Sequence, residues 1–227
     1  MNDAPGQSLA QLEPEGLSAE GQGWQQRKSA LTRITILEAA IDCLERCGYA
    51  RTTTQLIAQT AGISRGAMLH HYATKQDLIA SVIDYTVFKR MEAFLVRIQT
   101  LSEEQRVRYN AGVELYWQSL LTREFTAYLE LKVAARTDAE LREIFLPKAR
   151  EYDQIERREV KRAFPEWADN PGYALAMDYC IASMEGLLLN RDIWDSRDRR
   201  VALRRLISRT LTLIREHTLD DDETATA

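Results

Sequence analysis

The sequence predicts an all-α protein, in which a three-helix helix–turn–helix domain precedes a larger helical domain, with about nine helices in total. Apolar residues recur at steps of three and four from Ser29 onward, which is the spacing of one buried helix face. No run alternates between apolar and polar residues as a strand does, and no internal repeat occurs. Residues 52–78 outline two short helices joined by a tight turn.

The composition is that of an ordinary globular protein. The 227 residues are 45% hydrophobic and 28% charged, and a chain of this length hides roughly 70% of its unfolded surface on folding. No run of about 18 apolar residues occurs, so we expect no membrane span. The polar, acidic N-terminus shows no secretory signal, and we therefore expect a cytoplasmic protein.

Residues 1–26 are expected to form a disordered leader, because they are rich in Gln, Gly, Pro, Ser and Glu and lack apolar periodicity. Arg27 and Lys28 follow it. They are either an arm that contacts phosphate or solvated charges before a helix, and both interpretations stay open.

The first helix is predicted over 29–47 and ends at Gly48. Its apolar face consists of Ile34, Leu37, Ile41 and Leu44.

Two helices and a turn come next. Thr53 and Thr54 can cap the first helix, and Gly62 ends it because glycine adopts the left-handed conformation without a side-chain clash. Ser64 can cap the second helix, which is predicted over about 65–72.

The second helix presents side chains suited to DNA. Arg65 can reach base edges or phosphate, whereas the imidazoles and the amine of Lys75 can donate to phosphate. Small residues at the start of the helix let its backbone approach a surface closely. The outward set is Ser64, Arg65, Gly66, Ala67, Leu69, His70 and His71. Without the surrounding motif, these would be ordinary residues of an exposed helix.

The net charge of −4 hides a local excess of positive charge. Residues 27–75 hold seven basic and three acidic side chains, a balance of +4, whereas residues 1–26 hold four acids and no base. Residues 220–227 form an acidic tail. The positively charged segment is the one that carries the helix–turn–helix. Attraction of DNA phosphates depends on this local charge and does not require the whole chain to be basic.

The motifs in Thr32–Leu78 resemble the DNA-binding domain of the TetR family of transcriptional regulators. The first helix ends at Gly48–Tyr49, and paired threonines, I-A-x-x-A-G-I-S-R-G, H-H-Y and T-K-x-x-L follow. The resemblance implies DNA contacts by Thr54, Ser64, Arg65, Gly66, His70, His71 and Lys75, and the predicted set also includes Ala67 and Leu69. Leu69 departs from the family pattern, which often has a tyrosine there, but leucine can touch a thymine methyl group.

The rest of the chain is also predicted to be helical. A long helix opens at Lys75 and runs to about Leu101, and Pro147 is expected to kink or break a later one. The other helices are predicted over about 103–121, 124–136, 138–164, 170–188 and 200–219. Residues 27–75 then form the DNA-binding domain, and residues 76–219 form a ligand-binding and dimerisation domain.

The resemblance implies a ligand cavity and a homodimer in residues 76–219. Trp117, Tyr128 and Met177 are the candidate ligand contacts, although each could be ordinary core. Such residues suit a small, mostly apolar effector. The candidate interface residues are Met184, Leu188, Leu203, Ile207 and Leu211, whose stripes could equally face the subunit's own core. Dimer symmetry implies a palindromic double-stranded operator.

No catalytic or metal-binding set is visible in the sequence. The three histidines are not at zinc-ligand spacing from a cysteine or carboxylate, and no P-loop, dinucleotide glycine pattern or nucleophile elbow occurs. Cys43, Cys47 and Cys180 are interpreted as buried thiols rather than as a redox switch. We therefore expect no cofactor, no metal and no enzymatic activity.

The sequence thus predicts a sequence-specific transcriptional regulator, most simply a repressor that its ligand releases from DNA. One alternative is an all-helical small-molecule-binding or catalytic protein without a DNA role. The lack of a catalytic set and the positive charge of residues 27–75 argue against it. Another alternative is a regulator that binds DNA without any ligand, which a fully packed C-terminal domain would favour.

Overall fold

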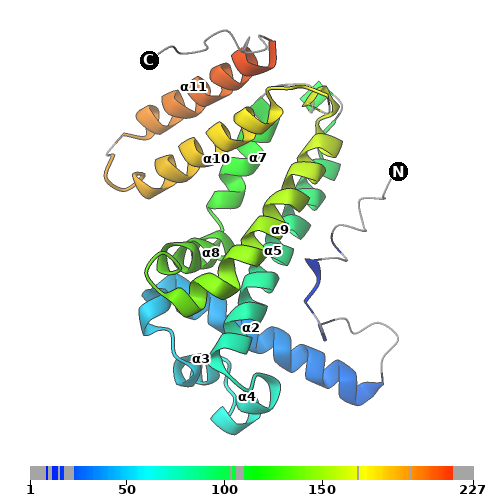
Figure 1. Cartoon of the computed structure of the whole chain (residues 1–227), viewed down its shortest axis with the longest axis vertical. Helices are drawn as coiled ribbons and strands as arrows, with labels where there is room; N and C mark the ends of the chain where they lie inside the picture. Colours follow the sequence, from blue (N-terminus) through cyan, green and yellow to red (C-terminus); the bar gives the residue numbers. More distant parts are fainter. Residues whose placement is uncertain are drawn as a thin grey trace. The chain divides into compact units, whose positions relative to one another are not determined.

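The computed structural model describes residues 9, 12–14, 16–17, 23–102, 104–105, 110–167, 169–194 and 196–216. In these residues all regular elements are helices, which confirms the all-α prediction (Figure 1). The chain divides into two compact units. Unit 1 comprises residues 1–95 and 121–156, and unit 2 comprises residues 96–120 and 157–227. The acidic tail predicted for 220–227 lies outside the described residues.

Unit 1 contains the predicted helix–turn–helix. Its helices are α2 (Trp24–Arg51), α3 (Thr54–Thr60), α4 (Arg65–His71), most of α5 (Lys75–Gln99), α8 (Arg123–Ala134) and most of α9 (Ala139–Ala163). Helix α2 packs against both α3 and α8. Leu37, Ile41 and Leu44 are fully buried, as their spacing predicts, whereas Ile34 is half-buried. Within the leader, Pro14 and Leu17 are buried.

Helix α8 is tied to α2 by an arginine. The Arg123 guanidinium pairs with Glu38 and, at 2.5 Å, with Oδ1 of Asp42. Glu38 also accepts a hydrogen bond of 2.6 Å from the hydroxyl of Tyr85 on α5. These contacts fix three helices around the DNA-binding segment.

The first helix is longer than its sequence predicts. Helical structure continues to Arg51, but Gly48 interrupts it with φ 72° and ψ 170°. A Cβ atom at position 48 would lie 2.9 Å from Oε2 of Glu130 on α8. Glycine suits this position because of its left-handed backbone, whereas the nearest Glu130 atom is the end of a flexible side chain that can move away.

Two expectations, one about a helix break and one about a helix start, differ from the structure. Helix α9 runs unbroken through Pro147, so the predicted break is absent, and buried side chains on both sides, Phe145 and Tyr152, hold the two halves to the core. The helix predicted from about residue 170 begins later, at Tyr173 after Gly172. Asn170 lies just before it, and its side chain accepts from the Gly172 amide at 2.9 Å and donates to the Arg215 carbonyl at 3.0 Å.

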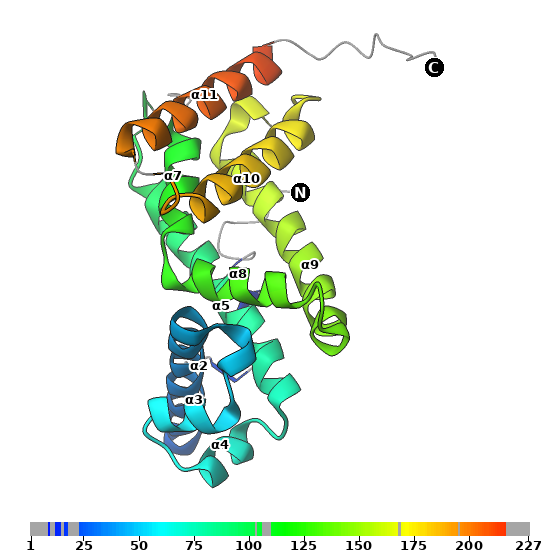
Figure 2. The ribbon, with the colours of Figure 1, turned by 90° about the vertical axis from the view of Figure 1, so that its left-hand side faces the viewer.

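Unit 2 is built on two neighbouring helices. Its elements are α7 (Asn110–Leu120), a 3-10 turn (Pro165–Trp167), α10 (Tyr173–Leu189) and α11 (Arg197–Glu216). Helices α10 and α11 run side by side and both contact α7 (Figure 2). In the part of the chain that the structure describes, no helix is long and apolar enough to cross a membrane.

Candidate nucleic-acid interface

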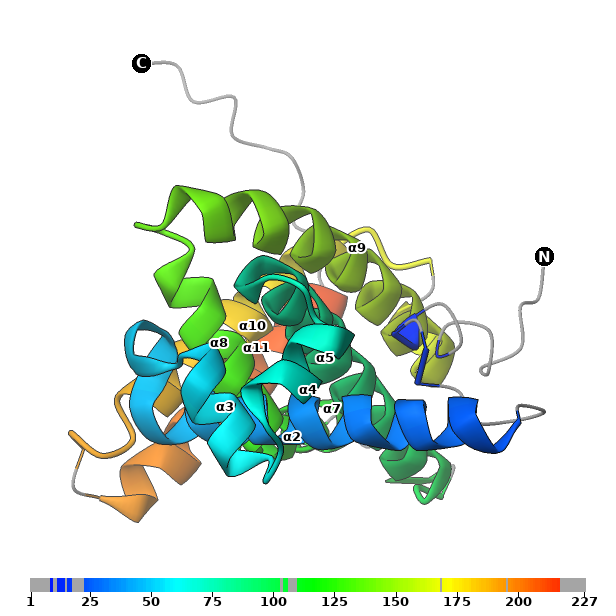
Figure 3. The same cartoon turned by 90° about the horizontal axis from the view of Figure 1, so that it is seen from below.

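The turn between α3 and α4 is built from caps at both helix starts. The Thr53 hydroxyl accepts from the Leu56 amide at 3.1 Å, and the Ser64 hydroxyl accepts from the Ala67 amide at 3.1 Å, as predicted for Ser64. Gly62 takes the left-handed conformation with φ 67°, which ends α3. Figure 3 shows α3 and α4 beside α2.

Helix α4 is fastened by a single side chain and leaves the rest of its surface free. Met68 is its one buried residue and is 0% exposed. Ser64, Arg65, Gly66, Ala67, Leu69 and His70 are exposed, and His71 is half-buried. A helix of seven residues with one buried residue leaves most of its surface exposed. Tyr72 directly follows α4 and is buried. Its ring centre lies 5.5 Å from the guanidinium carbon of Arg33, and this contact joins the end of α4 to α2.

Arg65 lies at the N-terminal end of α4, where helix–turn–helix proteins touch base edges. A Cβ atom at the neighbouring Gly66 would meet only the Ser64 hydroxyl oxygen, at 4.0 Å. The backbone is therefore accessible beside Arg65, and its planar guanidinium can pair with guanine O6 and N7.

The two histidines lie at the far end of α4. Their ring centroids are 5.5 Å apart in an edge-to-face arrangement. Burial lowers the pKa of His71, and the positive charges of Arg33 and His70 lower it further. The neutral form of His71 is thus favoured, and in that form one ring nitrogen can donate a hydrogen bond.

Lys75 has a different setting from Arg65. Its amine lies 4.5 Å from the centre of the Tyr49 ring, and the side chain is half-buried. Burial raises the pKa of Tyr49, with further contributions from the charge and hydrogen bond of Asp138. Lys75, Tyr49 and Asp138 line one open cavity of about 690 Å³ in unit 1. The Lys75 amine is therefore positioned by the Tyr49 ring instead of extending freely into solvent.

Most of the predicted DNA-contacting set thus lies on one exposed helix, with three members partly covered. Thr54, His71 and Lys75 are half-buried. Sequence reasoning did not single out Met68 or the pair that starts α5. The Thr74 and Asp77 side chains each accept from the other's amide at 3.0 Å. The T-x-x-D spacing before an apolar run was the available signal for this capping box.

Tyr128, a predicted ligand contact, belongs to an aromatic cluster in unit 1. Phe125, Tyr128 and Tyr152 surround the guanidinium carbon of Arg90 at 4.8, 5.0 and 5.1 Å from their ring centres. Arg90 is only 5% exposed. Burial raises the pKa of Tyr152 well above its usual value, although the positive charge of Arg90 acts in the opposite direction. A cation inside an aromatic cluster was not expected from the sequence.

The other two predicted ligand contacts lie in unit 2, so the three residues do not share one unit. Trp117 on α7 is buried and lies 4.9 Å from the guanidinium of Arg204 on α11, measured to its ring centre. Met177 on α10 is half-buried.

The predicted interface residues mostly pack inside unit 2. Met184, Leu188, Ile207 and Leu211 are buried in this single chain, and Leu203 is half-buried. The exposed leucines of the same two helices are Leu175, Leu189, Leu206 and Leu213. If α10 and α11 meet a second copy, the surface available for contact is formed by the leucines of this second set.

Comparison with known proteins agrees with this geometry. A family model described as "Bacterial regulatory proteins, tetR family" matches residues 36–82, which include α3 and α4. An uncharacterised helix–turn–helix-type transcriptional regulator of Mycobacterium bovis is 29% identical over 119 residues, which are 52% of this chain and 60% of that protein. The aligned part of the chain thus spans about three fifths of the length of that relative.

Solved structures share the fold. A TetR transcription regulator from Haloarcula marismortui is 20% identical with a TM-score of 0.63, over 81% of this chain and 97% of that one. A transcriptional regulator from Saccharomonospora viridis, solved in complex with choline, is 20% identical with a TM-score of 0.59, over 83% of this chain and 97% of that one.

Proposed function

We propose that this chain, which belongs to the TetR family of bacterial regulatory proteins, binds operator DNA through α4 and represses transcription until a small effector releases it. The observation that carries this proposal is the exposed face of α4 on a capped and anchored frame. Met68 fastens the helix, while Arg65 and its neighbours face outward. Arg65 reads base edges, and Lys75 neutralises a phosphate.

The active species in this proposal is a homodimer. Two copies of α4 related by a two-fold axis read two half-sites of a palindrome, whose centres lie about 34–36 Å apart along the DNA. Exposed leucines on α10 and α11 supply apolar surface for the contact between copies.

The effector in this proposal is small and mostly apolar. Supporting it are the aromatic side chains of α8 and α9 around Tyr128, and Trp117 in unit 2. The Saccharomonospora regulator was solved with choline, and aromatic rings also bind quaternary ammonium groups. Release requires the effector to bind the DNA-free arrangement of the subunits more tightly than the DNA-bound one.

Capture of random genomic fragments by the purified chain tests DNA binding. At about 0.15 M salt, the captured fragments should share one palindromic sequence. The matched control is Arg150→Ala, which removes an exposed arginine of α9 and should leave the captured set unchanged, whereas Arg65→Ala should lose it. Capture of unrelated fragments with no common sequence would favour the alternative, a helical small-molecule-binding protein.

A thermal-shift screen of acyl, aromatic and quaternary ammonium compounds tests the effector. Compounds that raise the melting temperature should also lower operator occupancy. They should stabilise Arg65→Ala equally, because that variant changes only α4. Stabilisation by polar sugars or nucleotides alone would contradict an apolar effector.

A further inference from the structure

Part of the N-terminal leader packs against unit 1, namely residues 12–14 and 16–17, which we call the leader segment. Pro14 is buried and Leu17 is only 7% exposed. The Leu17 amide donates to the Pro14 carbonyl at 3.3 Å, and Gly16 between them has a left-handed backbone with φ 76°. Burial of the two apolar side chains favours the packed arrangement of this segment.

The leader segment lies against α5 and α9 (Figure 1, dark blue). It lines one side of a cavity of about 200 Å³, and the two helices line the other side. The lining residues are Leu12, Glu13, Pro14, Asp84, Val87, Lys148 and Glu151. Within this lining, the Lys148 amine pairs with the Asp84 carboxylate at 2.5 Å and joins α9 to α5. The leader segment is therefore placed on the helix that directly follows α4 in the chain.

The leader segment also reaches Arg33 on α2. A Cβ atom at Gly16 would lie 3.5 Å from Nε and 3.6 Å from Cζ of Arg33, so the backbone of the segment is close to the guanidinium. The same guanidinium lies 5.5 Å from the ring centre of Tyr72. Arg33 thus joins the leader segment to Tyr72.

Tyr72 lies at the joint between α4 and α5. It caps the C-terminal end of α4, where its amide donates to the Met68 carbonyl at 2.9 Å, and it is 4% exposed. Burial raises the pKa of Tyr72, whereas the charge of Arg33 and hydrogen bonds with Arg33 and Ser81 act in the opposite direction. Lys75 opens α5 three residues later. The placement of Tyr72 therefore affects both the end of α4 and the start of α5.

We propose that Arg33 is a positioning residue of the DNA interface, and that the leader segment holds it against Tyr72 so that the end of α4 is already in place without DNA. This inference rests on the proposed function, because it takes α4 as the surface that meets DNA. A helix that is fixed beforehand loses less conformational freedom on binding, and its affinity for DNA is higher. Arg33 acts through Tyr72 and makes no phosphate contact of its own.

Two variants remove the two parts of this contact. Arg33→Ala removes the guanidinium, and P14S/L17S replaces the buried side chains of the leader segment without adding charge. In each, hydrogen exchange of the amides of residues 69–72 should become faster by at least about tenfold, because the end of α4 opens more often. Amides in the middle of α8 should exchange as before. Combining all three substitutions should give no further increase, since the leader segment acts through Arg33.

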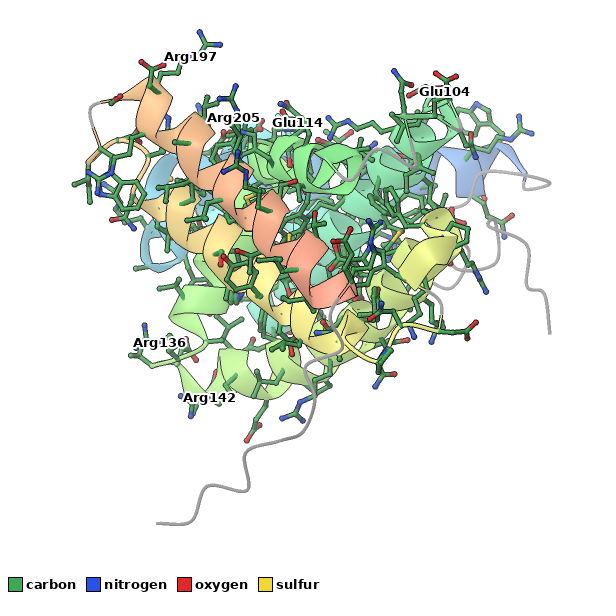
Figure 4. The ribbon with its side chains drawn as sticks, turned by 90° about the horizontal axis from the view of Figure 1, so that it is seen from above. Glu104, Glu114, Arg136, Arg142, Arg197 and Arg205 are labelled. Carbon is green, nitrogen blue, oxygen red and sulfur yellow. The ribbon has the colours of Figure 1, made fainter. Side chains whose placement is uncertain are left out.

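Two further variants are matched controls. Trp24→Ser removes an apolar side chain that follows the leader but is 74% exposed. Arg197→Ala removes the same charge as Arg33→Ala from the start of α11, where the exposed Arg197 side chain points away from the helix (Figure 4). Neither should change exchange at the end of α4. Circular dichroism shows whether each chain folds, and Pro14→Ser alone is the milder substitute for P14S/L17S.

Operator binding of the folded variants is measured at several salt concentrations. Arg33→Ala should weaken binding to the captured palindrome by about tenfold, with the log–log salt slope unchanged. A slope reduced by roughly 0.9 would mean that Arg33 neutralises a phosphate itself, and would overturn the proposal. Unchanged exchange in either variant, a larger increase in the combined chain, or faster exchange with unchanged operator affinity would also overturn it.

The exchange measurement needs no DNA, so it separates this proposal from the proposed function. If the unchanged chain captures no common palindrome, the proposed function fails. The exchange rates of Arg33→Ala and P14S/L17S then still decide whether the leader segment and Arg33 hold the end of α4.

Discussion

Arg65 and Arg90 carry the same charge in unit 1 but in opposite surroundings. Arg65 is exposed on a seven-residue helix that has one buried residue. Arg90 is 5% exposed and has the rings of Phe125, Tyr128 and Tyr152 about 5 Å from its guanidinium. An exposed guanidinium keeps its donors available for DNA, whereas one enclosed by rings contributes to the packing of α5, α8 and α9.

The difference shows that charge alone does not identify a candidate DNA contact. Arg65 is recognisable as a candidate because the cap at Ser64 and the glycine at position 62 define its place in the chain. Arg90 lies in the middle of a long helix, where its role depends on residues some 35 to 62 positions later. The setting of the arginine at position 65 can therefore be inferred from neighbouring residues, whereas at position 90 it depends on residues far along the chain.

Removing the anchor of α4 should have the largest effect. Met68→Ala leaves a cavity beneath a helix that has no other buried side chain, and it should lower the free energy of unfolding by about 2–5 kcal/mol. Operator binding should fall with it. The control is Leu69→Ala, at a position that is 40% exposed, which should change stability by less than about 0.5 kcal/mol in urea denaturation. Equal losses at both positions would contradict the anchoring role.

Arg90→Ala should have the next largest effect. It removes the cation–aromatic contacts and the packing of the side-chain stem, and should lower the free energy of unfolding by about 2–4 kcal/mol. The same substitution at Arg65 should change stability by less than about 0.5 kcal/mol and instead weaken DNA binding. Similar denaturation curves for both variants would remove the contrast between the two arginines.

Ser64→Ala should have a smaller effect. It removes the side-chain acceptor for the Ala67 amide and should cost about 1 kcal/mol, whereas Ser64→Gly should cost only a few tenths of a kcal/mol. Hydrogen exchange of the α4 amides should increase in the alanine variant. Unchanged exchange there would show that α4 does not depend on its cap.

The smallest effect should be the loss of stability in acid that His71 causes. Because its pKa is lower in the folded protein than its ordinary value of 6.5, protonation favours the unfolded chain. The His71 contribution to stability is therefore full above pH 6.5 and is lost as the pH falls through 6.5 toward the lower folded-state pKa. His71→Gln should reduce the fall in melting temperature between pH 7 and pH 5. An identical pH profile in the variant would exclude His71 as the group responsible.

The helical class and the helix–turn–helix could be predicted from local signals. The cap at Ser64 and the left-handed glycine at position 62 act within a few residues, and the structure contains both. The passage of α9 through Pro147 could not be predicted, because the compensating contacts come from side chains buried against other helices. Local propensity yields to tertiary packing in such cases.

The predicted sites divide in the same way. The α4 residues follow from their spacing, whereas the place of Tyr128 beside Arg90 depends on how α5, α8 and α9 meet. On α10 and α11, apolar spacing identified the buried stripe of Met184 and Leu211 but not which side of each helix stays exposed. A stripe has the same spacing whether it faces its own chain or a second copy.

Comparing Arg65→Ala with Lys75→Ala tests most directly the claim that α4 reads sequence. Both variants are titrated against the captured palindrome and a scrambled DNA at several salt concentrations. Lys75→Ala should weaken binding to both DNAs alike and reduce the log–log salt slope by roughly 0.9 for one phosphate contact. Arg65→Ala should cost about 1–3 kcal/mol on the palindrome only, and relax the preference at one position of each half-site. Equal weakening of both DNAs by Arg65→Ala would contradict base reading by this arginine.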